Sequence, residues 1–233
     1  MENSNGTLTR RRVLGTVAAG AGLWGSGCLD SVPGNSGDET ASPTGTAPET
    51  TLGRADPDAL SAPYLGAEES DVVVRAWEDF SCPHCRTYNE RVVSQLRENY
   101  LADEVVRYEH HDYPLPVTEW SWPTAIAARG VQSRAGNDAF WTFTAGAYEN
   151  QDDPGWSTIR SLAEDAGASP DTVVEEARAE YWRPVVEADK SDGSDRGVSS
   201  TPTVFVNDHP VSGNTWPEFY ENVVDAIEDR RDG

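Results

Sequence analysis

The sequence has few positively charged residues for its length. Its 233 residues include 18 Lys and Arg residues, of which only Lys190 is a lysine, against 40 Asp and Glu residues, and the formal net charge is −22. Nucleic-acid binding depends on basic side chains that neutralise phosphates, so this balance excludes a nucleic-acid-binding protein. Self-repulsion between so many carboxylates destabilises a compact state in dilute buffer, whereas molar salt shortens the screening length to about 3 Å.

The sequence also lacks an apolar run long enough to span a membrane. The weakly apolar stretch 13–24 is too short, and it follows Thr9-Arg10-Arg11-Arg12-Val13-Leu14, which resembles a twin-arginine export signal. It ends in Gly25-Ser26-Gly27-Cys28, where small residues lead into a cysteine as in lipoprotein signal peptides. We predict that residues 1–27 are removed and that Cys28 is lipidated. A plain exported protein with a spare cysteine, or an uncleaved anchor, remains open.

Residues 28–61 are predicted to form a disordered linker behind the lipid anchor. Gly, Ser, Thr and Pro dominate this segment, and large apolar side chains are almost absent. Such a composition cannot offset the entropy lost on folding. Eight Trp, eight Tyr and five Phe lie mostly after residue 60 and argue for a packed core there, against an acidic chain that is disordered throughout. We therefore expect one folded domain over residues 62–233.

Only three cysteines are present, and two of them lie one helical turn apart in Cys82-Pro83-His84-Cys85. This motif follows the strand-like run 72–77, so its first thiol is expected at the start of a helix, where unpaired N–H groups and the helix dipole favour a thiolate. Pro83 suits the first helical turn. His84 is a candidate for lowering the thiol pKa further, and Cys85 is the candidate buried partner. A zinc site would need further ligands, for which His110 and His111 are the nearby candidates.

These features together resemble a DsbA-like thiol-disulfide oxidoreductase. The resemblance rests on Asp79-Phe80-Ser81-Cys82-Pro83-His84-Cys85, on the segment 197–207, which contains Thr201-Pro202, and on the hundred or so residues between them. It implies a thioredoxin-like α/β fold with a helical insertion, at about residues 115–190, between a βαβ half and a ββα half. It also implies that Cys82 is the nucleophile, Cys85 the resolving thiol and His84 a tuning residue. Pro202 is then a cis-proline, and the backbone at Thr201 is free to pair with a substrate peptide.

The sequence departs from the family at one position near the dithiol. Many relatives have a buried glutamate six residues before the first cysteine, where this chain has Ala76. Glu78 and Asp79 are nearby, but we expect them to point differently along a strand of period two. Asp79 remains a weak candidate for proton transfer, with a loop-capping role as the alternative.

The hydrophobic pattern predicts strands over 72–77 and 104–111, the active-site helix over 83–100, and a strand pair over 203–211 that turns at Asn207-Asp208. The predicted helices of the insertion and of the C-terminus are 123–131, 138–150, 158–166, 170–180 and 218–230. Residues 191–197 are predicted to be a polar loop. The aromatic side chains Trp120, Trp122, Phe140, Trp141 and Phe143 either pack in the insertion or line a peptide groove, and packing is the favoured interpretation.

The function that these features predict is oxidation of thiol pairs in exported proteins. No organic cofactor is needed, but a membrane redox partner must recycle the dithiol. With the export signal, the acidic composition resembles that of haloarchaeal proteins and places the domain outside the cell, on the outer face of the cytoplasmic membrane. Reductase or isomerase activity remains open. So do a copper carrier that uses Cys82, Cys85 and His209, and a lipoprotein with a vestigial site.

Overall fold

A mixed β-sheet organises the folded part of the chain, of which this computed structural model describes residues 52–102 and 105–231. The strand order is β1-β3-β2-β4-β5, with β2 and β3 parallel and the other neighbours antiparallel. The strands are β1 (Tyr64–Gly66), β2 (Val73–Glu78), β3 (Arg107–Asp112), β4 (Thr203–Val206) and β5 (His209–Val211). Helices connect β2 to β3, intervene between β3 and β4, and follow β5, which confirms the predicted thioredoxin-like arrangement with a helical insertion.

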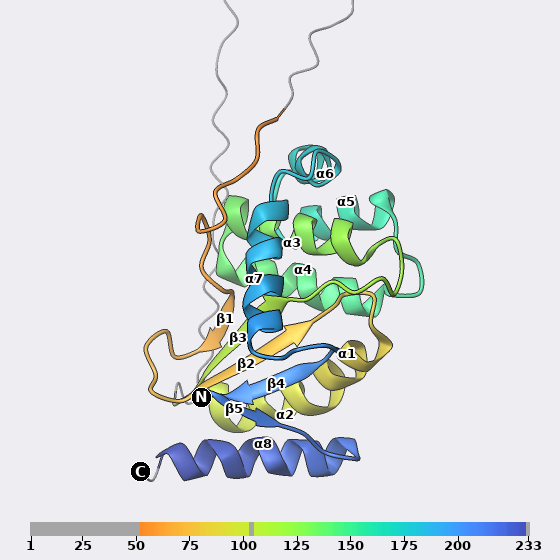
Figure 1. Ribbon diagram of the computed structural model, residues 1–233. Coiled ribbons are helices and arrows are strands. Elements are labelled where there is room, and N and C mark those ends of the chain that lie inside the picture. The colour runs from red at the N-terminus through yellow and green to blue at the C-terminus, as the bar shows by residue number, and fades with distance from the viewer. Residues whose placement is uncertain (1–51, 103–104, 232–233) are drawn as a thin grey trace, which may run out of the picture. The chain divides into compact units, whose positions relative to one another are not determined.

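Helices cover both faces of the sheet. The segment after β2 is one continuous helical stretch of α1 (Pro83–Tyr88), the π-helical turn η1 (Asn89–Val93), α2 (Ser94–Leu96) and a second π-helical turn η2 (Arg97–Leu101). The remaining helices are α3 (Ser121–Ala135), α4 (Asn137–Glu149), α5 (Trp156–Asp165), α6 (Pro170–Arg178), α7 (Arg183–Asp195) and α8 (Trp216–Arg231). Figure 1 shows α1, α2 and α8 along one side of the sheet and α7 along the other, with the inserted helices α3 to α6 grouped beside α7.

The alternation of side chains along β2 divides the core into two parts. Val74 and Ala76 face the main hydrophobic cluster, which also contains buried side chains of α1, α3, α4 and α8. Trp77 points to the opposite face and forms a second cluster with Tyr113, Val198 and Phe205. Because successive side chains of a strand point to opposite faces, β2 contributes to both clusters and is buried on both sides.

Several element boundaries differ from the sequence-based prediction. Strand β1 was not predicted; it is three residues long and lies at the sheet edge, where it pairs with β3. Helix α3 begins at Ser121, so Pro123 lies within its first turn. The predicted polar loop 191–197 is wrong over most of its length, because α7 continues to Asp195. This extension packs on the sheet, since Gly193 lies against the ring of Trp77, so tertiary packing overrides the weak helix propensity of the segment.

The structure describes the predicted linker only from residue 52 onward. Ala55 is buried, and its N–H donates to the carbonyl of Tyr181 at 2.8 Å, so residues before 62 already contact the domain. The predicted signal peptide and Cys28 lie outside the described residues. Among the residues that are described, no helix is long and apolar enough to cross a membrane.

Gly193 lies at a close contact between α7 and the sheet. A Cβ added there would be 2.6 Å from Cδ1 of Trp77 and 3.0 Å from Cδ2 of Tyr113, and Trp77 is fully buried. We expect Gly193→Ala to lower the free energy of unfolding by about 1–2 kcal/mol, because the clash outweighs the gain of about 1 kcal/mol in helix propensity. Urea denaturation in molar salt measures this change.

The matched control is Gly53→Ala, because no atom lies within 4 Å of a Cβ at that exposed position. It is expected to change stability by no more than about 0.5 kcal/mol. Equal stabilities of the two variants would show that the contact between α7 and Trp77 can relax at little cost.

Candidate active site

The dithiol lies at the junction between β2 and α1. Cys82 is the residue before the first turn of α1, with φ −82° and ψ 118°, and Pro83 occupies the first helical position as predicted. The N–H groups of Cys85 and Arg86 donate to the carbonyl of Cys82 at 3.0 and 3.2 Å. Both cysteines are free thiols and both are buried, so the structure describes the dithiol form of the pair.

The Thr201-Pro202 loop is brought against Cys82 from a position 119 residues further along the chain. The peptide bond between Thr201 and Pro202 is cis, as the resemblance implied, and Sγ of Cys82 lies 3.4 Å from the carbonyl oxygen of Thr201. β4 begins directly after this loop, at Thr203, and pairs with β2, at whose end the dithiol begins. The sheet therefore fixes the position of the loop relative to the dithiol.

The surroundings of Cys82 favour its thiolate. A hydrogen bond from the Cys85 thiol is the largest effect, and together with the Thr201 side chain and the N–H groups of Cys85 and His84 it lowers the pKa of Cys82 to about 5, against the opposing effect of burial. The hydroxyl of Thr201 is buried and has no other hydrogen-bond partner among the described residues. The lowered pKa makes Cys82 the candidate nucleophile of the pair.

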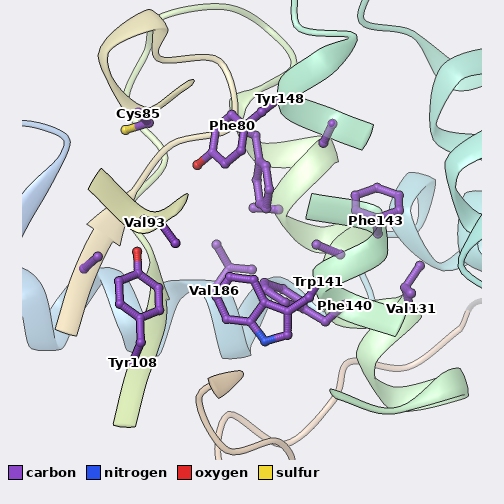
Figure 2. Close-up of a cluster of buried hydrophobic side chains, with 14 of the residues drawn as sticks. Phe80, Cys85, Val93, Tyr108, Val131, Phe140, Trp141, Phe143, Tyr148 and Val186 are labelled. Atoms are coloured by element: carbon purple, nitrogen blue, oxygen red, sulfur yellow. The ribbon is translucent and has the colours of Figure 1, made fainter. Parts of the chain in front are cut away.

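Cys85 has the opposite electrostatic environment. It is completely buried, and its Sγ is 3.5 Å from the N–H of Asp79. Burial raises the pKa of Cys85 well above its ordinary value, and the hydrogen bond to Cys82 and the negative charge of Glu78 act in the same direction. Figure 2 shows Cys85 at one end of the core, near the rings of Phe80 and Tyr148. A proton is therefore held at Cys85 while Cys82 is ionised.

An open groove begins beside the dithiol. It has a volume of about 850 Å³ and lies between the start of α1, the Thr201-Pro202 loop and the loop that connects β5 to α8. His84, Thr87, Asn214, Trp216 and Phe219 are among the residues that line it, and none of its lining residues is Asp, Glu, Lys or Arg. The imidazole of His84 is exposed at this groove, and only the backbone N–H of His84 contributes to the lowered pKa of Cys82.

Asp79 is buried and stabilises the loop between β2 and α1 through hydrogen bonds to the backbone. Its carboxylate accepts hydrogen bonds from the N–H groups of Ser81 and Leu115, both at 2.8 Å. Burial raises the pKa of Asp79, while these two hydrogen bonds and one from Ser121 act against that rise. The contacts support the loop-capping alternative, because both carboxylate oxygens are engaged by backbone groups.

Glu78 is the site residue that sequence reasoning missed. It was expected to point differently from Ala76, but the two residues are two positions apart on β2 and both are buried on the same face. Its carboxylate accepts hydrogen bonds from the hydroxyls of Tyr108 and Tyr148, each at 2.9 Å, and from Asn89. The signal in the sequence was an acidic residue two positions after Ala76, and hence on the same face of the predicted strand.

The two histidines of β3 lie on opposite faces of the sheet and are held by carboxylates. His110 is fully buried, with Nε2 3.2 Å from Asp112 and Nδ1 3.4 Å from Glu78. His111 stacks on Trp77 and contacts Asp189 and Glu109. No group of three or more His, Cys, Asp or Glu side chains within the described residues is arranged to hold a metal ion. The predicted packing role of Phe140, Trp141 and Phe143 is confirmed, since all three are buried.

Comparisons with known proteins agree with this geometry. A family model described as thioredoxin matches residues 59–228. Disulfide bond formation protein D of Bacillus subtilis is 24% identical over 178 residues, which cover 74% of this chain and 78% of that protein. A probable disulfide bond formation protein D of Bacillus cereus is 28% identical over 152 residues, covering 61% and 68%.

Solved structures show the same fold. The oxidised BdbD of Bacillus subtilis superimposes with a TM-score of 0.68 and 22% identity, covering 78% of this chain and 98% of that one. Chlamydia trachomatis DsbA superimposes with a TM-score of 0.63 and 16% identity, covering 76% and 96%. With its dithiol at the start of α1, its cis Thr201-Pro202 bond and its helical insertion, the chain belongs to the thioredoxin family, as a DsbA-like thiol-disulfide oxidoreductase.

Proposed function

We propose that this protein oxidises thiol pairs in exported proteins, outside the cytoplasmic membrane. The observation that carries this direction is the stabilised thiolate of Cys82, whose pKa is lowered to about 5. A stabilised thiolate makes the reduced enzyme more stable than it would otherwise be, so the oxidised enzyme transfers its disulfide readily. The names of the relatives, disulfide bond formation proteins, support the same direction.

The reaction uses both cysteines and two electrons. A substrate thiolate attacks Sγ of Cys82 in the oxidised enzyme, the bond between Cys82 and Cys85 breaks, and Cys85 leaves as a thiolate that takes up a proton. A second substrate thiolate then attacks the substrate sulfur of the mixed disulfide and displaces the Cys82 thiolate. The substrate gains a disulfide, and the enzyme is left with two reduced cysteines.

The groove beside the dithiol is the proposed binding site for the substrate peptide. The backbone of Thr201 borders the groove and Pro202 lines it, so an extended peptide that pairs with Thr201 would bring its cysteine to Cys82. The exposed imidazole of His84 would then lie next to the mixed disulfide and tune its reactivity. Because no charged side chain lines the groove, an acidic substrate meets no local repulsion there.

The proposed function also requires a membrane anchor for the domain and a partner that reoxidises the dithiol. A lipid on Cys28 would hold the domain at the outer face of the membrane, and a membrane redox partner would reoxidise the pair. The Gly-, Ser-, Thr- and Pro-rich composition of the linker before residue 52 would let the domain reach both substrates and this partner.

The reduction potential of the dithiol tests the direction of the reaction. The oxidised protein is equilibrated with glutathione buffers in molar salt, and the reduced fraction is determined by trapping free thiols. We expect a potential well above that of thioredoxin, near the value of about −120 mV that is typical of DsbA. A potential near about −270 mV would assign the protein to the disulfide reductases instead.

A further inference from the structure

A chain of buried ionisable groups leads away from Cys85 into the domain. Glu78, His110 and Asp112 have side chains that are fully buried, and they come from the neighbouring parallel strands β2 and β3. In the register of these strands Glu78 is opposite Asp112 and Ala76 is opposite His110, so the small side chain of Ala76 leaves room for the imidazole between the two carboxylates. The thiol-disulfide exchange described above assigns no role to this group.

These buried groups lie close to one another. Oε1 of Glu78 is 3.4 Å from Nδ1 of His110, and Nε2 of His110 is 3.2 Å from Oδ1 of Asp112. On the side of the dithiol, the amide of Asn89 donates both to Glu78 and, at 3.0 Å, to the backbone carbonyl of Cys85. The charge of Glu78 acts directly on the Cys85 thiol. The Glu78 carboxylate is therefore a neighbour of both the resolving thiol and the imidazole.

Aromatic rings and charged or titratable groups surround His110. The aromatic rings of Phe80, Phe140 and Trp141 enclose the imidazole and exclude water. The titratable and charged groups are contributed by five elements: Glu78 of β2, Tyr108 and Asp112 of β3, Cys85 of α1, Tyr148 of α4 and Arg129 of α3. Burial lowers the pKa of His110, but the neighbouring carboxylates of Asp112 and Glu78 outweigh this effect and raise the pKa to about 9. At neutral pH the imidazole therefore holds a proton.

The end of this series of buried groups that is farther from Cys85 approaches the surface. Nε of Arg129 is 2.6 Å from Asp112, and the same guanidinium pairs with Asp189 of α7, whose side chain is 17% exposed. The N–H of Asp112 also donates to Asp189 at 3.0 Å. Arg129 thus places a positive charge beside the Asp112 carboxylate, whose other oxygen faces the imidazole of His110.

We propose that His110 is the proton store for the resolving thiol, delivering a proton through Glu78 to the Cys85 thiolate when the disulfide opens. The proposal rests on Cys82 and Cys85 being the redox pair. When a thiolate forms a bond to Sγ of Cys82, the sulfur–sulfur bond breaks and its electron pair stays on Cys85. The proton of Nδ1 of His110 passes to the Glu78 carboxylate, and Glu78 passes it on to the Cys85 thiolate. His110 is left neutral, and solvent returns its proton before the next turnover.

Proton supply at this step avoids an unfavourable charge arrangement. A Cys85 thiolate left beside the Glu78 carboxylate would place two negative charges together in a buried environment, which is strongly unfavourable. Transfer of one proton from His110 removes the charge on the sulfur and leaves Glu78 as it was. The oxidised enzyme thus holds this proton before the reaction begins, which favours opening of the disulfide by substrate.

The test is the rate at which the oxidised full-length protein reacts with glutathione in molar salt, followed by rapid quench and thiol trapping from pH 5.5 to 9.5. Rates are expressed per glutathione thiolate. We expect the wild-type rate to be constant at low pH and to fall near pH 9, where His110 loses its proton. His110→Asn should react on the order of a hundredfold more slowly at pH 7 and show no fall near pH 9, because it has no proton to supply.

The matched control is His111→Asn, because His111 is adjacent in sequence but lies on the opposite face of β3. It should keep the wild-type rate and the wild-type pH profile. A His110→Asn variant with the wild-type profile, or a His111→Asn variant with the same loss, would overturn the proton-store role. A wild-type protein that does not react with glutathione at all would overturn the proposed function as well.

The wild-type protein provides a further measurement that does not depend on the folding of a variant. If His110 donates a proton as the disulfide opens, the reaction should be slower in D₂O than in H₂O below pH 9, and this difference should disappear above pH 9. Equal rates in the two solvents throughout the pH range would contradict the proposal.

Discussion

Replacing Cys82 with serine is expected to abolish the oxidation of substrate thiols, lowering the rate by at least roughly a thousandfold. Cys82 is the residue before the first turn of α1, and its pKa is lowered to about 5, so at neutral pH it is the ionised, reactive sulfur of the pair. A serine hydroxyl in this place cannot form a disulfide. The measurement is the rate of disulfide formation in a reduced peptide that contains two cysteines, with the oxidised enzyme in molar salt.

Cys85→Ser is the informative partner of this variant. It also cannot cycle between dithiol and disulfide, but it keeps the nucleophile and a hydroxyl that can donate to the Cys82 thiolate in place of the Cys85 thiol. When it is mixed with the disulfide form of the peptide, its Cys82 thiolate attacks the peptide disulfide and displaces one peptide thiolate. We expect the resulting mixed disulfide to accumulate, because no Cys85 thiol is present to resolve it, and mass spectrometry detects it; Cys82→Ser should form none. A mixed disulfide on Cys85 in the Cys82→Ser variant would show that the roles of the two cysteines are reversed.

The features that could be predicted from sequence are those set by local patterns. Two cysteines separated by two residues indicate a dithiol at a strand-to-helix junction, and Pro83 marks the first turn of α1. Thr201-Pro202 precedes a short apolar strand. Each of these signals lies within about ten residues. The sheet then brings the two segments together, because β2 and β4 are paired neighbours.

The features that were missed depend on contacts between distant parts of the chain. Glu78 is held by Tyr108 and Tyr148, which lie 30 and 70 residues away in the sequence. His110 gains its role only because parallel pairing of β2 and β3 places it opposite Ala76. Likewise, α7 extends to Asp195 because Gly193 fits against Trp77, and no pattern within residues 191–197 contains that information. The buried proton chain is therefore a property of the tertiary structure.

The reduced protein is expected to be more stable than its Cys82→Ser variant by an amount that increases with pH. The pKa of Cys82 is lowered from its ordinary value of 9.0 to about 5 in the folded protein, chiefly by the hydrogen bond from Cys85. A group whose folded pKa is lowered contributes stability that is fully present above its unfolded pKa and is lost as the pH falls through its folded pKa. The contribution should thus grow from nearly zero below pH 5 to its full value above pH 9, reaching about 3 kcal/mol at pH 7.

Urea denaturation of the reduced wild-type and Cys82→Ser proteins at several pH values measures this contribution. The titration of the carboxylates affects both proteins equally, so it cancels when their free energies of unfolding are subtracted. Cys85→Ala, which removes the donor, should raise the pKa of Cys82 and reduce the difference, whereas Cys85→Ser should keep much of it. A difference that does not change between pH 5 and 8 would contradict the stabilised thiolate. The same linkage acts on catalysis: only the reduced enzyme has the thiolate, so the free energy that stabilises it also favours transfer of the disulfide to a substrate.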